Sequence, residues 1–230
     1  MNKRKKIENI YIIVPAYNEE FVIRSTIKNL EKYFENIVVV NDGSTDKTIK
    51  ELKGSNITLI NHPLNLGVGA AIQTGFQFIL THCKDAIGII TFDADGQHDV
   101  NDALQIAENL ITGSEDIIFG SRFLGHQENV PFIKRTALRA VNKITNFLTS
   151  VNLTDAHNGL KGFRKSAIKE INLEINGYAY ETEIIMQVKK NKLSYKEIPT
   201  NIIYTDYSKK KGQKLLNGLI ILEDLLRLWR

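Results

Sequence analysis

The hydrophobic pattern in the first half of the chain alternates between short apolar runs and longer amphipathic stretches. The apolar runs are nearly continuous and rich in β-branched residues, which is typical of strands covered on both faces. The expected strands cover residues 10–14, 37–40, 57–60, 87–92 and 116–119, and the expected helices cover residues 19–33, 45–52, 68–81 and 101–111. Strand–helix alternation predicts right-handed βαβ units, and therefore an α/β fold with a mainly parallel sheet flanked by helices.

The pattern in the second half is more mixed. The expected elements are helices over residues 131–150, 180–190 and 213–229, and strands over residues 159–164 and 195–204. The last helix is amphipathic, with an apolar stripe that ends at Trp229. Because no repeat or flexible linker interrupts the chain, we expect a single domain over residues 1–230.

Composition and charge narrow the class of protein. Hydrophobic residues make up 43% and charged residues 24%, as in a soluble globular protein. The formal charge is +4, and basic residues cluster at 3–6 and 209–214. Such clusters suit a phosphate-bearing ligand or an anionic membrane surface. Nucleic acid is not an expected partner, because no recognised binding motif accompanies the charge.

Cysteine usage and hydropathy indicate a cytoplasmic protein. The single cysteine, Cys83, excludes an internal disulfide and is interpreted as a buried structural thiol. No stretch approaches the roughly 20 apolar residues that span a bilayer. Peripheral contact with the cytoplasmic membrane face, or with a membrane partner protein, stays open.

The strongest chemical signal is the sequence DADGQH at residues 93–98, directly after the expected strand 87–92. Two carboxylates spaced by one residue at a strand end, Asp93 and Asp95, cannot both be buried without a cation. Oxygen ligands select Mg²⁺ or Mn²⁺, and substrate phosphates fill further positions on such ions. An acidic turn that caps the next helix is the alternative interpretation.

Two further motifs follow the first and second strands. In VPAYNEE, Asn18 is expected to cap the next helix and Glu20 to suit its positive end, whereas Pro15 and Tyr17 suit a pocket for a nucleobase. In NDGSTD, the turn and a helix cap explain residues 43–46, and Asp42 could accept hydrogen bonds from a nucleobase or ribose.

The sequence NLGVG at residues 65–69 resembles a dinucleotide-binding loop only superficially. Ile72 stands where a third glycine is expected, and the loop follows the third strand instead of the first. We expect its glycines to allow close packing of the backbone against the donor or a helix.

Together with GSR at residues 120–122, these motifs resemble family 2 of the glycosyltransferases over nearly the whole chain. The resemblance implies the GT-A fold, with a Rossmann-like nucleotide-sugar-binding half at about 1–120 and an acceptor-side half at about 121–230. It implies that Pro15, Tyr17, Glu19 and Asp42 hold the nucleoside of a UDP- or GDP-linked sugar. It also implies that Asp93, Asp95 and Gln97 hold Mg²⁺ or Mn²⁺ and the donor diphosphate, with Asp95 among the catalytic residues.

Within that family the chain looks most like the dolichyl-phosphate mannosyltransferase branch, which glycosylates polyprenyl phosphates. The residues implied to handle the acceptor phosphate are Arg122, Arg135, Arg139 and Lys214. Thr154-Asp155, the segment from Gly159 to Lys161, and Glu183 match further motifs of the branch. Lys161 replaces a usual arginine, and Gln213 stands where serine is common.

The implied reaction inverts the anomeric centre in one displacement. A phosphate acceptor is already ionised and needs little help from a base, so Arg122 would position it. A sugar-hydroxyl acceptor, as in surface polysaccharide or glycan synthesis, would need a carboxylate base, for which Asp155 and Glu183 are candidates. A nucleotidyltransferase and a nucleotide-sugar-binding protein without activity remain alternatives of other classes.

Overall fold

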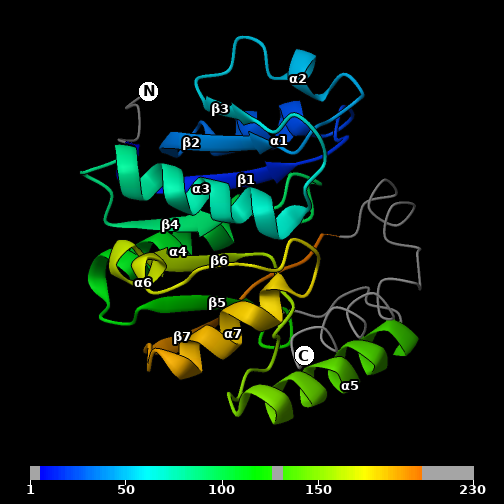
Figure 1. The fold of residues 1–230 in the computed structure, drawn as a ribbon, viewed down its shortest axis with the longest axis vertical. Coiled ribbons are helices and arrows are strands. Elements are labelled where there is room, and N and C mark those ends of the chain that lie inside the picture. Colours follow the sequence, from blue (N-terminus) through cyan, green and yellow to red (C-terminus); the bar gives the residue numbers. More distant parts are fainter. Residues whose placement is uncertain (1–5, 126–131, 204–230) are drawn as a thin grey trace.

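The computed structural model describes residues 6–125 and 132–203. Seven strands form one sheet in the order β3-β2-β1-β4-β6-β5-β7 (Figure 1). The strands are β1 (Ile7–Ala16), β2 (Phe34–Asn41), β3 (Thr58–Asn61), β4 (Gly88–Thr91), β5 (Ile117–Ser121), β6 (Lys161–Arg164) and β7 (Tyr195–Pro199).

The sheet is parallel except at β6. The pairs β1–β2, β2–β3, β1–β4 and β5–β7 are parallel, whereas β6 runs antiparallel to β4 and β5 on either side of it. The mainly parallel α/β sheet expected from the sequence is therefore confirmed. Because β6 is reversed, it begins at the edge where the other strands end.

Helices cover both faces of the sheet. They are α1 (Ile23–Leu30), α2 (Thr48–Glu51), α3 (Val68–His82), α4 (Val100–Thr112), α5 (Phe132–Thr149), α6 (Lys165–Lys169) and α7 (Tyr180–Lys190). Residues of α3, α6 and α7 form one core with one face of the strands, and residues of α1 and α4 form a second core with the other face. Successive residues of β1 alternate between the cores, since side chains of a strand point to opposite faces.

The connection after β1 differs from the expected helix, which begins only at Ile23. Asn18 has a φ of +53°, and its side chain accepts a hydrogen bond from the Thr45 backbone at 2.9 Å. The backbone N–H of Glu19 donates to the Thr48 hydroxyl at 2.8 Å. These groups join the loop after β1 to the loop after β2 and the start of α2. The N-cap of α1 is Val22, so the expectation that Asn18 caps this helix is wrong.

Helix α5 turns polar side chains inward. Asn142, Thr145 and Thr149 are buried, whereas Ile144 and Phe147 are 49% and 85% exposed. The expected helix over residues 213–229 and the basic cluster at 209–214 lie outside the described residues. Within the described ranges, no helix is both long and apolar enough to cross a bilayer. Cys83 is a buried free thiol, as expected.

Candidate active site

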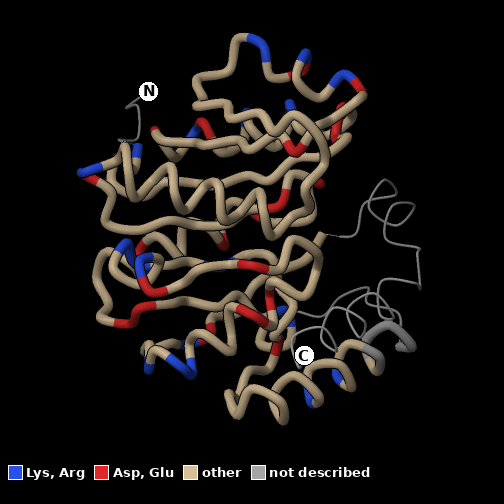
Figure 2. Tube along the Cα trace, viewed as in Figure 1, with Lys and Arg blue, Asp and Glu red and all other residues tan. Residues whose placement is uncertain are grey.

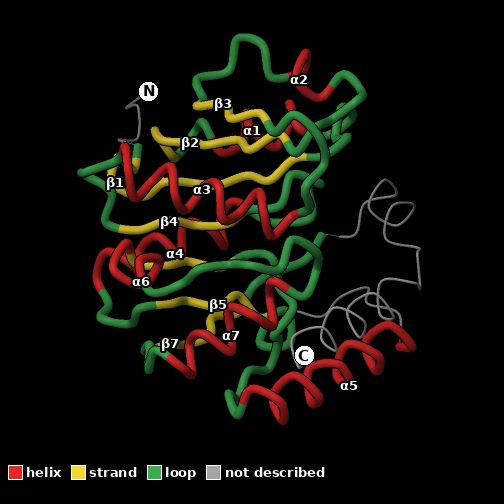
Figure 3. Tube along the Cα trace, viewed as in Figure 1, coloured by secondary structure: helices red, strands yellow, loops and turns green. Residues whose placement is uncertain are grey.

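A cavity of about 590 Å³ opens at the edge where the parallel strands end. Loops form this edge (Figure 3). The predicted site residues that line the cavity together are Pro15, Tyr17, Glu19, Asp42, Asp93, Asp95, Gln97 and Arg122. Pro15 is the second-last residue of β1, and the others follow β1, β2, β4 and β5, as expected for a ligand site at the carboxyl ends of parallel strands.

The acidic motif after β4 concentrates negative charge in this cavity. Burial raises the pKa of Asp95, and the neighbouring Asp93 carboxylate raises it further. The Gln97 backbone N–H donates to Asp95 Oδ1 at 3.0 Å, and the Gln97 amide donates to Oδ2. Asp93 Oδ2 lies 2.9 Å from His98 Nε2. Both carboxylates are therefore oriented by neighbours of their own motif.

This charge fits a divalent cation. A raised pKa means that the site holds two negative charges only at a free-energy cost, which a cation would remove. Among the described residues, no group of three or more His, Cys, Asp or Glu could hold a metal ion. Ions such as Mg²⁺ and Mn²⁺ commonly use only one or two carboxylates and take other ligands from substrate phosphates. The residues present thus fit an ion that binds together with a diphosphate.

Asp42, which follows β2, lines the same cavity. The residue is 3% exposed, and its carboxylate accepts hydrogen bonds from the backbone of Leu66 at 2.9 Å and Gly67 at 2.8 Å. Asp42 Oδ1 also lies 2.8 Å from His62 Nδ1. The carboxylate therefore ties the end of β2 to the loop before α3. Tyr17, which is 42% exposed, adds an aromatic residue to the lining of the same cavity.

The glycines of NLGVG pack against a distant segment. Gly67 has a φ of +104°, and a Cβ there would lie 2.2 Å from the Asn176 carbonyl oxygen. A Cβ at Gly69 would lie 2.0 Å from the Ile175 carbonyl oxygen. The glycines do allow close backbone packing, as expected, but the backbone they pack against belongs to the segment before α7, and not to the donor or a helix.

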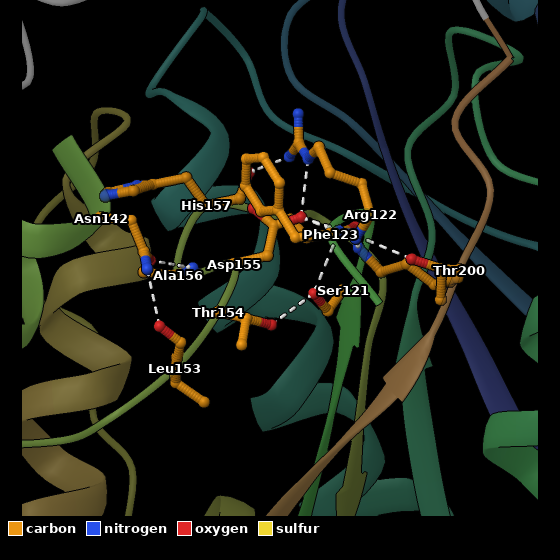
Figure 4. Close-up of polar contacts among 12 residues, drawn as sticks. Ser121, Arg122, Phe123, Asn142, Leu153, Thr154, Asp155, Ala156, His157 and Thr200 are labelled. Atoms are coloured by element: carbon orange, nitrogen blue, oxygen red, sulfur yellow. Dashed lines mark hydrogen bonds and ion pairs between the residues drawn. The ribbon is translucent and has the colours of Figure 1, made fainter. Parts of the chain in front are cut away.

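Arg122 is held in place by an acidic neighbour (Figure 4). Asp155, which is 2% exposed, accepts hydrogen bonds from Arg122 Nε at 2.6 Å and from the Arg122 backbone at 2.9 Å. Arg122 Nη2 donates to the His157 carbonyl oxygen at 2.5 Å. Arg122 lines the cavity and Asp155 does not. Asp155 thus orients the guanidinium group and is poorly placed to act as a base.

Glu183 also lies away from the cavity. Its two carboxylate oxygens accept hydrogen bonds from the backbone of Glu174 at 2.9 Å and Ile175 at 3.0 Å. The structure therefore brings neither candidate base to the cavity. Arg139 is exposed, with its guanidinium carbon 5.6 Å from the centre of the Phe123 ring. The side chains of Arg135 and Lys214 lie outside the described part.

His157 and Glu181 also line the cavity, although the sequence did not single them out. Glu181 Oε1 lies 3.0 Å from Lys161 Nζ, and Glu181 Oε2 lies 3.2 Å from His157 Nδ1. Burial alone would raise the pKa of Glu181, but the Lys161 ammonium and the hydrogen bond from His157 lower it to about 2. Glu181 and Glu183 both lie in the first turn of α7, and no sequence signal indicated which would face the cavity.

The arrangement of acidic strand ends around one cavity agrees with the protein family that this chain matches. The family model described as glycosyl transferase family 2 matches residues 11–172. The chain belongs to glycosyl transferase family 2. This glycosyltransferase accordingly combines acidic side chains at its strand ends with an arginine in the wall of one cavity.

Two relatives cover almost all of this glycosyltransferase. An uncharacterized protein of Methanocaldococcus jannaschii is 39% identical over 95% of this chain and 91% of its own length. The UDP-N-acetylglucosamine–dolichyl-phosphate N-acetylglucosaminyltransferase of Methanococcus voltae is 35% identical over 95% of both chains.

Solved structures agree with the fold. The glucosyl-3-phosphoglycerate synthase of Mycobacterium tuberculosis, solved with Mn²⁺, UDP and glucosyl-3-phosphoglycerate, is similar with a TM-score of 0.67. It is 14% identical, and the match covers 95% of this chain and 79% of the synthase. At this identity the similarity shows the GT-A fold alone.

Proposed function

We propose that this glycosyltransferase moves a sugar from a nucleotide-sugar to a polyprenyl phosphate of the dolichyl type, in a single inverting displacement that depends on a divalent cation. The observation that carries the proposal is the 35% identity, over 95% of both chains, to an enzyme named for a UDP-sugar donor and a dolichyl-phosphate acceptor. The cavity supplies matching chemistry at each end.

The donor end is formed by the first two strands. Tyr17 offers a ring for the nucleobase, and Asp42 fixes the loop that closes this end. Asp93, Asp95 and Gln97 would hold Mg²⁺ or Mn²⁺, and the bound ion would neutralise charge on the departing nucleoside diphosphate.

The acceptor end favours a group that is already ionised. A sugar hydroxyl requires a base, and an efficient base has a pKa near the working pH. Glu181 is a cavity carboxylate whose pKa of about 2 makes it a weak base. A phosphate oxygen needs no such base, and the guanidinium of Arg122 suits its geometry.

The outer surface of this half supports a lipid acceptor. Helix α5 contains basic but no acidic residues, as Figure 2 shows for its described part. Its exposed apolar side chains, Ile144 and Phe147, suit contact with a membrane or a membrane partner. We propose that the protein works in the cytoplasm, at the cytoplasmic face of a membrane.

A donor panel tests the proposal. Purified protein with MnCl₂ would be given UDP- and GDP-linked sugars, with and without a polyprenyl phosphate. We expect labelled sugar to enter the lipid fraction only when the cation and the polyprenyl phosphate are both present. Transfer to a soluble glycan acceptor, with none to the lipid, would favour the sugar-hydroxyl alternative. Donor binding without transfer to either acceptor would favour the binding-protein alternative.

A further inference from the structure

The segment that precedes α7, residues 172–178, bridges the two halves of the molecule. On the α3 side, the Gly69 backbone donates to the Asn176 carbonyl at 2.9 Å, and the Leu173 backbone donates to the Gln73 side chain at 2.9 Å. On the α7 side, two successive backbone N–H groups donate to the two oxygens of Glu183. The bridging segment is therefore anchored from both sides.

Steric contacts leave the bridging segment little freedom to move toward α3. Gly67 and Gly69 face the carbonyl oxygens of Asn176 and Ile175 at distances that exclude any Cβ. Because the contact atoms on the segment are backbone, they cannot move aside by changing a rotamer. The position of the segment is thus set by these two glycines and by the Glu183 carboxylate.

Tyr178 lies at the end of the bridging segment and lines the cavity. The side chain is 51% exposed, so its ring is open to a ligand. Burial raises the pKa of its phenol, and the carboxylates of Asp93, Glu19 and Asp95 raise it further. The hydroxyl is therefore a protonated hydrogen-bond donor at neutral pH, in the same cavity that Asp93 and Asp95 line.

We propose that Tyr178 contacts the donor by donating a hydrogen bond to its diphosphate, and that Glu183, Gly67 and Gly69 are positioning residues that hold Tyr178 there. The inference rests on the proposed nucleotide-sugar donor. A neutral hydroxyl suits this place, since a diphosphate brought to the acidic motif by a cation adds anionic oxygens that accept hydrogen bonds strongly. The proposal also explains how Glu183, which does not line the cavity, can affect the site through the bridging segment.

The direct test compares Tyr178→Phe with Tyr33→Phe, a half-buried tyrosine that packs on the second core and does not line the cavity. Calorimetry with UDP and with GDP, each with MnCl₂, measures the dissociation constant. We expect Tyr178→Phe to raise it about tenfold for the nucleotide that binds, as for one lost hydrogen bond, and Tyr33→Phe to leave it unchanged. An unchanged constant in Tyr178→Phe, or no binding of either nucleotide to the wild type, overturns the proposal.

The positioning role is tested with Glu183→Gln, which offers one acceptor oxygen where the segment needs two. In Glu183→Gln, hydrogen exchange should accelerate at the amides of Glu174 and Ile175, and nucleotide affinity should fall. Gly69→Ala should reproduce both effects. The variant with both changes should show effects no larger than those of either single variant. Unchanged exchange and affinity, with loss of turnover alone, would instead make Glu183 a base. The hydrogen-exchange measurement needs neither donor nor acceptor. If no sugar is transferred to polyprenyl phosphate, that result counts against the proposed function, and the exchange result for Glu183 still stands.

Discussion

Single side chains in this enzyme act through charges that are partly or fully removed from water. Asp95 is the clearest case, because its pKa is raised by burial and by Asp93. A folded-state pKa above the ordinary value means that Asp95 destabilises the metal-free fold as the pH rises through that raised pKa. The acidic motif therefore costs the fold stability at neutral pH, and the proposed cation would remove that cost.

We predict that Asp95→Asn lowers sugar transfer by about 10²-fold or more, the scale expected when electrostatic stabilisation of a leaving group is lost. The same change should raise the melting temperature of the metal-free protein at pH 7. Differential scanning calorimetry with and without MnCl₂ should show cation stabilisation in the wild type and none in the variant. Asp99→Asn, which keeps a helix-capping side chain at α4, is the matched control. Full transfer in EDTA would contradict the cation requirement.

The buried pair of Glu181 and Lys161 affects stability in the opposite direction from Asp95, because the pKa of Glu181 is lowered. The folded-state pKa of Glu181, about 2, lies below its usual value of 4.5. Its contribution to stability is therefore present above about pH 4.5 and is lost as the pH falls toward 2. Removing one partner leaves the other as an unpaired buried charge.

We predict that Glu181→Gln lowers the free energy of unfolding by about 3 kcal/mol at pH 7. The difference from wild type should shrink as the pH falls below 4.5, the usual pKa of this carboxyl. Denaturant titrations at several pH values measure this. The double variant Glu181→Leu with Lys161→Met should recover much of the loss, because apolar replacements leave no buried charge. A loss that does not depend on pH would rule out the ion pair as its cause.

At the scale of secondary-structure elements, buried carboxylates hold loops in place by accepting hydrogen bonds from the loop backbone. Asp42 at the end of β2 accepts two backbone hydrogen bonds from the loop that begins α3. Glu183 does the same for the segment before α7. The backbone N–H groups of a loop lack the hydrogen-bond partners that a sheet or helix would provide. The two oxygens of one carboxylate can accept hydrogen bonds from two such groups at once.

We predict that Asp42→Ala weakens donor binding by about 1–3 kcal/mol, the cost of leaving buried hydrogen-bonding groups without a partner. The physical reason is the loosening of the loop over residues 62–67, together with the removal of any hydrogen bond that Asp42 makes to the nucleoside. Calorimetry with the donor nucleotide measures the affinity, and circular dichroism checks the fold. Unchanged affinity would mean that Asp42 only closes the turn.

At the scale of the whole molecule, a lipid-phosphate acceptor requires the cavity to reach a membrane. The basic residues Lys209 to Lys211 lie outside the described part, ahead of the expected amphipathic helix. Basic side chains attract anionic lipid with roughly 1 kcal/mol each near the surface. The alternative is that the apolar stripe of this helix packs on the domain core.

We predict co-sedimentation with anionic vesicles that weakens with salt. Changing Lys209, Lys210 and Lys211 to glutamine should lower vesicle affinity by about two orders of magnitude, as the sum of three such attractions. The matched control changes three exposed lysines in and around α2 to glutamine, namely Lys47, Lys50 and Lys53. This removes the same charge at another place and should have little effect on vesicle affinity. Core packing predicts instead no vesicle binding, and loss of folding in Leu222→Asp.

The sequence by itself determined the layered fold and the part of the cavity at the ends of β1, β2 and β4. Continuous apolar runs specify strands covered on both faces, and alternation with helices specifies parallel pairing. Parallel strands end at one edge, so Pro15, Tyr17, Asp42, Asp93 and Asp95 could be placed together from their positions alone.

Tertiary structure alone decided the wall of the cavity that carries Arg122 and Glu181. Side chains two residues apart on a helix point about 200° from each other, so packing selected Glu181 for the cavity and turned Glu183 toward the bridging segment. Asp155 and Arg122, 33 residues apart, meet because the reversed strand β6 lies between β4 and β5. Neither choice is visible in the local sequence pattern, since each depends on packing between residues that are distant along the chain.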